Sequence, residues 1–265
     1  MTVALQVSDT HFGTERPVAM AALRQLCAEL RPDLLLVTGD ITQRARAHEF
    51  DSARAFFDGL QVPARLIVPG NHDIPLFDLF TRAVRPYRGF ERVFGAALEG
   101  EFERDDLLVI ALNTTRRWRH SNGEVSAAQV ERVAARLARA SPAQLKLVAV
   151  HQPVAAITHE DVANLLRGRH HAVRRWAAAG ADAVVGGHIH LPYVLPLRER
   201  WPELARNLWC VQAGTAVSHR LRGGISNSVN VIRTRPAAVQ RWDLDEAAGE
   251  FRCVATTPLH PAPLG

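Results

Sequence analysis

The sequence predicts an α/β fold whose core is a parallel β-sheet. Over the first 70 residues, short apolar runs such as Leu34–Val37 alternate with stretches of helical periodicity. Several of these runs end in a turn, as Ala64–Val68 does at Pro69-Gly70. Alternating strands and helices favour parallel strands joined by right-handed crossovers. With 265 residues, 47% of them hydrophobic, the chain is large enough for one domain with an extensive core.

The first third of the chain carries the clearest pattern. A helix over about 18–30 places Leu23, Leu26 and Leu30 on one face, and Pro32 closes it. Residues 76–98 are helical but interrupted by Pro86 and Gly89, which predicts two short helices that could form a cap over the sheet end. The other elements expected here are strands at 3–8, 34–37 and 64–68 and a helix at 47–59.

The rest of the chain predicts more strands than helices. Ser126 is a typical helix N-cap, and the strand at 145–150 is uniformly apolar apart from Lys146. We expect a hairpin at 100–112, helices at 126–140 and 161–179, and strands at 145–150, 183–185, 208–213, 227–233 and 238–243. Because no linker or repeat divides the chain, residues 1–265 should form a single domain, with a loosely ordered tail at 258–265.

Composition narrows the range of partners. The net charge of +5 could indicate nucleic-acid binding, but Lys146 is the only lysine and the arginines are scattered, so a nucleic-acid partner is not expected. Three cysteines at unrelated spacings fit reduced thiols better than disulfides. There is no apolar stretch of the length of a membrane span and no leader pattern at the N-terminus, so we expect no membrane partner and a cytoplasmic location.

Polar residues stand at the end of five expected strands. In open α/β sheets, sites lie outside the carboxyl ends of the strands, so these residues can converge on one edge. Asp9 and His11 stand two apart, as do His188 and His190, which in extended backbone puts both side chains of a pair on one side. The five clusters are Asp9/His11, Asp40, Asn71/His72/Asp73, His151 and His188/His190.

These side chains make a metal-ligand set of nitrogen and oxygen atoms without a thiolate. Such a set suits Mn²⁺, iron, Co²⁺ or Zn²⁺ and disfavours Cu(I) and iron–sulfur clusters. Two aspartates, one asparagine and four histidines are too many for one ion, but they match two ions that share a bridging carboxylate. A single histidine or aspartate is more often structural, so the inference depends on all seven together.

The five blocks, in this order, resemble the signature of the calcineurin-like metallophosphoesterase superfamily. They span about 180 residues, and each follows an apolar strand, which makes the resemblance specific. The resemblance implies a four-layer α/β sandwich, with two mixed β-sheets flanked by helices and the metal site at the carboxyl ends of the strands. The blocks are Asp9-Thr10-His11, Gly39-Asp40, Gly70-Asn71-His72-Asp73, His151 and Gly187-His188-Ile189-His190.

The resemblance also implies a role for each residue. One metal would be held by Asp9, His11, Asp40 and His190, and the other by Asp40, Asn71, His151 and His188. His72 would act on the substrate phosphate as a stabiliser or as the acid for the leaving oxygen, and Asp73 would orient it. Two ions of this kind lower the pKa of a shared water and clamp the phosphoryl oxygens, so no protein nucleophile is needed.

Within the superfamily, the chain resembles the bacterial branch of cyclic-nucleotide phosphodiesterases. Ser8-Asp9-Thr10-His11 near the start of the chain and the Val68–Asp73 block fit this branch, as does Ala213–Ala216. We therefore expect a small-molecule phosphodiester substrate, foremost a 3′,5′-cyclic nucleotide, and Mn²⁺ or iron ahead of Zn²⁺ or Co²⁺. A phosphomonoesterase or a nuclease on the same metal centre is the alternative, and a non-enzymatic scaffold of this fold is a more remote one.

Several residues outside the five signature blocks can be interpreted in two ways. Arg116, Arg117 and Arg119 could bind a substrate phosphate or nucleobase, as could Arg220 and Arg222, although solvated loop arginines are more common. Within the blocks, Asn71 and His72 are the expected substrate contacts. Trp118 could stack on a base or pack against the cap. An aromatic cluster could pack the cap onto the sheet or form a homodimer interface; its members are Phe77, Phe80, Tyr87, Phe90 and Phe94.

Overall fold

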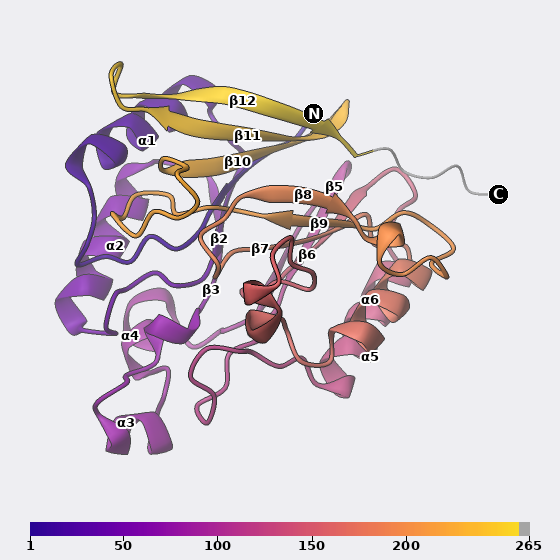
Figure 1. The fold of residues 1–265 in the computed structure, drawn as a ribbon, viewed down its shortest axis with the longest axis horizontal. Helices are drawn as coiled ribbons and strands as arrows, with labels where there is room; N and C mark the ends of the chain where they lie inside the picture. Colours follow the sequence, from indigo (N-terminus) through magenta and orange to yellow (C-terminus); the bar gives the residue numbers. More distant parts are fainter. Residues whose placement is uncertain (260–265) are drawn as a thin grey trace.

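The computed structural model describes residues 1–259, in which two six-stranded mixed sheets carry helices on their outer faces (Figure 1). The first sheet has the strand order β12-β11-β10-β1-β2-β3. Its strands β1, β2 and β3 are parallel, while β10, β11 and β12 join them as an antiparallel meander. The bounds are β1 Val3–Val7, β2 Leu34–Thr38, β3 Ala64–Val68, β10 Ser228–Thr234, β11 Ala237–Asp245 and β12 Glu250–Pro258.

The second sheet has the order β4-β5-β6-β7-β9-β8. Its four central strands are parallel, and antiparallel strands β4 and β8 form its two edges. The bounds are β4 Gly100–Arg104, β5 Leu107–Ala111, β6 Leu145–Ala149, β7 Ala183–Gly186, β8 Tyr193–Pro196 and β9 Trp209–Gln212. The first sheet thus contains both ends of the described chain, and the second contains its middle.

Three apolar clusters hold the layers together. In β2, Leu35 and Val37 pack toward helices α1 (Pro17–Leu30) and α2 (Ala47–Gly59). Leu34 and Leu36, which point to the other face, pack against the second sheet. The far face of the second sheet is covered by α5 (Ala127–Ala138) and α6 (Arg169–Ala178) (Figure 1). The four-layer sandwich implied by the family resemblance is confirmed.

The predicted interrupted helix forms two short helices, α3 (Leu79–Val84) and α4 (Arg88–Phe94). Asp78 caps α3 by accepting a hydrogen bond from Thr81 N. Phe90 and Phe94 of α4 pack on the core beside α2, whereas Phe77 and Phe80 are each 78% exposed. The predicted packing of the aromatic cluster is therefore confirmed for Phe90 and Phe94 and is wrong for Phe77 and Phe80.

Other predicted elements differ in detail from the structure. The helix expected at 161–179 is divided into a 3-10 turn, η2 (Glu160–Asn164), and α6, because Gly168 adopts a φ of +84° between them. The loosely ordered tail predicted at 258–265 is wrong for its first two residues, since Pro258 ends β12 and Leu259 is buried; residues 260–265 lie outside the described residues. Two further 3-10 turns are η1 (Asn71–Asp73) and η3 (Leu197–Glu199). None of the helices within residues 1–259 has the length and apolar composition of a membrane span.

Candidate dinuclear metal centre

The predicted metal ligands follow the carboxyl ends of five strands that belong to both sheets. Asp9 and His11 come after β1, Asp40 after β2 and Asn71 at the start of η1. His151 follows β6, while His188 and His190 follow β7. Hydrogen bonds tie the two sheets together here: His188 N donates to Asp9 Oδ2 at 2.9 Å, and His151 Nδ1 donates to Thr38 O at 2.8 Å.

The ligand atoms gather into two groups. In each group, the candidate ligand atoms all lie within 4.8 Å of one another. Asp40 belongs to both and offers a different oxygen to each: Oδ1 lies 3.3 Å from His151 Nε2, and Oδ2 lies 3.8 Å from His11 Nε2. This is the arrangement of a bridging carboxylate. The groups are Asp9, His11, Asp40 and His190, and Asp40, His151 and His188.

The donor atoms themselves fit a pair of cations. His11 Nε2 lies 3.0 Å from His190 Nε2, and His151 Nε2 lies 3.2 Å from His188 Nδ1. Asn71 Oδ1, which is not among the acidic and imidazole atoms of the two groups, lies 3.2 Å from His151 Nε2. Buried nitrogen and oxygen atoms with lone pairs this close need a cation or protons between them. A set without sulfur suits Mn²⁺, iron, Co²⁺ or Zn²⁺.

Backbone carbonyls orient two of the imidazoles. A carbonyl oxygen can only accept, so Nδ1 of His151 donates to Thr38 O and Nδ1 of His190 donates to Arg220 O, each at 2.8 Å. Each bond leaves Nε2 pointing into the cluster. Partners of this kind fix the orientation of a metal-binding ring and raise its basicity.

Burial and mutual charge give most of these groups the protonation state of a metal ligand. Burial lowers the pKa of His11 and of His188 to about 3, so both rings are neutral at pH 7. Burial would raise the pKa of Asp9, but the hydrogen bond with His190 and the charges of His190 and His151 together outweigh this and lower it to about 2. His151 and His190 differ. Burial would lower the pKa of each ring, but the charge and hydrogen bond of Asp40 raise that of His151 to about 9, and the hydrogen bond and charge of Asp9 raise that of His190. A metal ion would take the place of these protons.

Five candidate ligands adopt a backbone conformation that favours glycine. Among residues 1–259, eight non-glycine residues have a positive φ, and five of the eight are candidate ligands. Such conformations cost about 1–3 kcal/mol each and persist where the surroundings hold them in place. Their concentration at one edge of the sheets is typical of a functional site. The five are Asp9 (φ 52°), His11 (φ 42°), Asp40 (φ 48°), His188 (φ 77°) and His190 (φ 56°).

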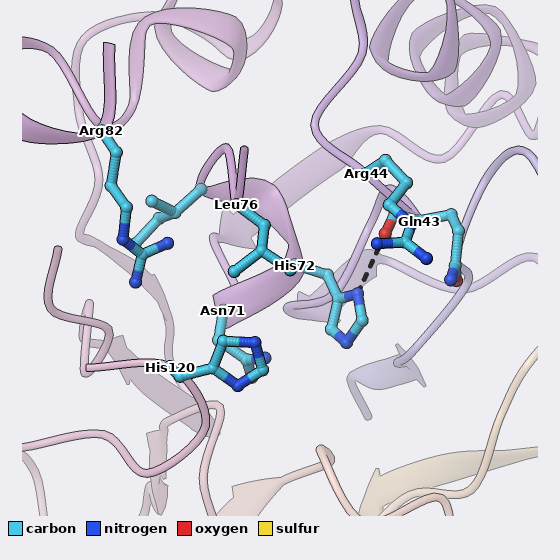
Figure 2. Close-up of a pocket in the computed structure, with 8 residues that line it drawn as sticks. Gln43, Arg44, Asn71, His72, Leu76, Arg82 and His120 are labelled. Carbon is cyan, nitrogen blue, oxygen red and sulfur yellow. Dashed lines mark hydrogen bonds between the residues drawn. The ribbon is translucent and has the colours of Figure 1, made fainter. Parts of the chain in front are cut away.

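His72 lies beside the cluster. Its backbone N donates to Asp40 Oδ1 at 2.8 Å, and its ring Nδ1 donates to Gln43 O at 3.0 Å, as the dashed line in Figure 2 shows. Its ring meets that of His11 edge-on, with centroids 4.8 Å apart. The partner that orients the His72 ring is therefore the Gln43 carbonyl, whereas the family resemblance implied Asp73.

Asp73 acts on the loop instead. It is fully buried and accepts hydrogen bonds from Gly70 N, Ile41 N and both N and Oγ1 of Thr42, at 2.8–3.1 Å. Burial still raises the pKa of Asp73 to about 6. Through these bonds, Asp73 joins the turn after β3 to the segment that follows Asp40, so it reaches His72 only through the backbone.

A cleft opens next to His72 on the side of α3. Figure 2 shows Arg44 and Arg82 on opposite sides of it, with His72 and His120 between them. Arg82 Nη2 donates to Arg119 O at 2.7 Å, which ties α3 to the loop after β5. The predicted cap thus forms one wall of the opening. The cleft is lined by Gln43, Arg44, Asn71, His72, Ile74, Leu76, Arg82 and His120.

The profile of the calcineurin-like phosphoesterase family matches residues 3–192, which contain all seven candidate ligands together with His72 and Asp73. The chain belongs to this family. The match ends after His190 and leaves out the C-terminal strands β8 to β12.

Individual relatives agree with this assignment. The metallophosphoesterase chain is 29% identical over 203 residues to a cAMP/cGMP dual specificity phosphodiesterase of Mycobacterium tuberculosis, covering 71% of this chain and 61% of that protein. It is 27% identical over 201 residues to a probable cyclic nucleotide phosphodiesterase of Rhodococcus erythropolis, covering 70% and 64%. The match therefore spans less than two thirds of the length of either relative. A dimetal phosphatase from Danio rerio shares the fold, with a TM-score of 0.67, 12% identity and coverage of 97% and 98%.

In the structure, the predicted substrate arginines of this metallophosphoesterase bind neighbouring parts of the chain. Arg116 donates to Asn113 O, Thr115 O and Gln129 Oε1, and Arg117 donates to Ala83 O of α3. Trp118 is 66% exposed. These arginines hold the loop and the cap in place, and their contact with substrate stays a prediction.

The sequence named Arg220 among the arginines that could bind substrate but did not predict its position beside His11 and His72. Arg220 Nη1 lies 3.3 Å from both His11 Nδ1 and His72 Nε2. The sequence marks it only as one of several loop arginines, and nothing local distinguishes it from Arg222. Its approach depends on contacts 148 and 209 residues apart in the chain.

Proposed function

We propose that this metallophosphoesterase hydrolyses small phosphodiesters, foremost 3′,5′-cyclic nucleotides, with two Mn²⁺ or iron ions in the cluster. The observation that carries the proposal is Asp40, whose two oxygens serve two groups of buried ligand atoms. Asp9, His11 and His190 would complete one site, and Asn71, His151 and His188 the other. The names of the two curated relatives support a cyclic nucleotide as substrate. We expect this enzyme to act in the cytoplasm.

The two ions would supply an activated water and a clamp for the phosphoryl oxygens. The chain's own residues would position the substrate and protonate its leaving oxygen. Because Nδ1 of His72 donates to Gln43 O, the nitrogen that would face the substrate is Nε2, which lies 3.3 Å from Arg220 Nη1. In the imidazolium form, His72 can give the Nε2 proton to the leaving oxygen and return to the neutral state. Asp73 keeps the loop, and with it His72, at a fixed distance from Asp40.

The test is hydrolysis by the Mn²⁺-loaded protein of 3′,5′-cyclic AMP, compared with bis(p-nitrophenyl) phosphate. His190→Ala serves as the blank, because it removes a ligand without touching His72. Comparable or faster turnover of the cyclic nucleotide supports the proposal. Cleavage of the aryl diester with no cyclic-nucleotide turnover would retain the diesterase chemistry and reject the substrate. Faster cleavage of p-nitrophenyl phosphate or of single-stranded DNA would instead favour a phosphomonoesterase or a nuclease.

A further inference from the structure

The segment between β9 and β10 brings one arginine to the metal centre from outside the part of the chain that the family profile matches. Its backbone is tied to the first sheet, since Ala216 N donates to Ser8 O and His219 N donates to Thr14 O, both at 3.0 Å. At Arg220, the carbonyl oxygen accepts from His190 Nδ1 at 2.8 Å and from Thr215 Oγ1 at 3.0 Å. The main chain of Arg220 is therefore fixed directly against a candidate ligand.

The side chain of Arg220 turns toward His72. Its Nη1 lies 3.3 Å from His72 Nε2, 3.3 Å from His11 Nδ1 and 3.4 Å from Gln43 Oε1. In Figure 2, His72 and Gln43 lie side by side at one end of the cleft. The guanidinium thus lies next to the atom of His72 that would face the substrate.

This guanidinium has no anionic partner in the described part of the chain. Within residues 1–259, no carboxylate oxygen lies within 4.0 Å of it, and its neighbours are imidazoles and an amide oxygen. Arg222, two residues further on, provides a contrast: its Nη1 donates to the buried Asp161 Oδ1 at 2.6 Å and to Ile189 O at 3.1 Å. Arg222 is a paired structural arginine, whereas Arg220 is a half-buried cation that lacks an acid.

We propose that Arg220 binds a non-bridging phosphoryl oxygen of the substrate beside His72, as an anion site that the C-terminal segment adds to the metal centre. A guanidinium presents several N–H groups to a phosphate, and charge-assisted hydrogen bonds of this kind are about twice as strong as neutral ones. The inference rests on the proposed function, since it assigns part of the same site. It also predicts that phosphate itself, which carries more charge than a diester, binds through Arg220.

The test compares Arg220→Ala and Arg220→Lys with Leu221→Ala in the Mn²⁺-loaded full chain. Leu221 is the matched control, because it is the neighbouring residue, is 42% exposed and has no part in the site. Three quantities are measured: manganese content, the affinity for inorganic phosphate by calorimetry, and KM and kcat for bis(p-nitrophenyl) phosphate. Because the carbonyl and not the side chain of residue 220 holds His190, all three variants should retain two ions.

Arg220→Ala should weaken phosphate binding and raise KM, each by about 10- to 100-fold, with Arg220→Lys in between and Leu221→Ala unchanged. Wild-type phosphate affinity in Arg220→Ala with two ions bound would overturn the inference, as would metal loss in both Arg220 variants, which would make the residue structural. The phosphate measurement needs no turnover. If the wild type cleaves no diester but binds phosphate through Arg220, the proposed function fails and this inference stands.

Discussion

Gly70 offers the most direct test of how tightly the ligand loops pack. A Cβ at this position would lie 2.1 Å from Asp40 N and 2.2 Å from Asp40 Oδ1. Ordinary van der Waals contact begins at 3.4 Å, so Gly70→Ala must separate the loop after β3 from Asp40 by about 1 Å. The backbone of Gly70 has φ −100°, which alanine adopts freely. Any effect of Gly70→Ala therefore comes from this contact and not from backbone strain.

The consequence should be seen first at the metals. Ligand distances in metal sites are defined to about 0.2 Å, and Asp40 belongs to both ligand groups, so a shift of this size affects both ions. We expect Mn²⁺ affinity to fall by about 10- to 100-fold. At saturating Mn²⁺, turnover of bis(p-nitrophenyl) phosphate should fall by about 100-fold, because His72 moves with Gly70. The free energy of unfolding of the metal-free protein should drop by about 1–3 kcal/mol.

The control is Gly59→Ala, at the last residue of α2, where an added Cβ has no neighbour within 4 Å. It should stabilise the protein by about 0.4–1 kcal/mol and leave metal affinity and turnover unchanged. Calorimetric titration with Mn²⁺, initial rates and urea unfolding of both variants provide the comparison. Wild-type metal affinity and wild-type turnover in Gly70→Ala would refute the packing argument.

Three further predictions follow from single side chains. Asp40→Ala removes an oxygen from each ligand group and should lose both ions; two ions per chain by elemental analysis would exclude a bridging role. His72→Ala should keep both ions and lose about 10²- to 10⁴-fold in turnover, and unchanged activity would remove His72 from the mechanism. Asp106 is buried, which would raise its pKa, but hydrogen bonds from Thr2 and Thr234 outweigh this and lower it. A lowered pKa means that Asp106 stabilises the fold above the ordinary carboxyl pKa of 3.8, and that this contribution disappears as the pH falls below it. Asp106→Asn should therefore lower the free energy of unfolding by about 1–2 kcal/mol at neutral pH but by much less near pH 2. Urea unfolding of the variant and the wild type at both pH values measures this, and the same loss of stability at both would contradict it.

The sequence predicted the metal site most accurately where a candidate ligand follows a strand with a clear apolar pattern. Asp9, Asp40 and His151 each follow a uniformly buried strand, and strand ends of parallel sheets share an edge whatever the details of the fold. The two-sheet arrangement came only from the family resemblance, because parallel strands in either one or two sheets have the same apolar pattern.

The remaining features depend on contacts that are distant in the sequence. Strand β8 is only four residues long, and β12 exposes most of its side chains, so neither stands out by periodicity. The break before α6 had a local signal in Gly168, which the helical pattern around it concealed. The position of Arg220 had no such signal, since the first sheet's loops determine where its segment lies.

The five candidate ligands with a positive φ also bear on how this protein can evolve. Each of the five would be less strained as glycine or asparagine. A lineage that stopped using the ions would therefore relieve backbone strain wherever glycine replaced one of these five ligands, and mutation could erode the cluster. Selection for chemistry is the force that opposes this drift. Five strained residues gathered at one site are thus what we expect where the ions are in use, whatever the substrate.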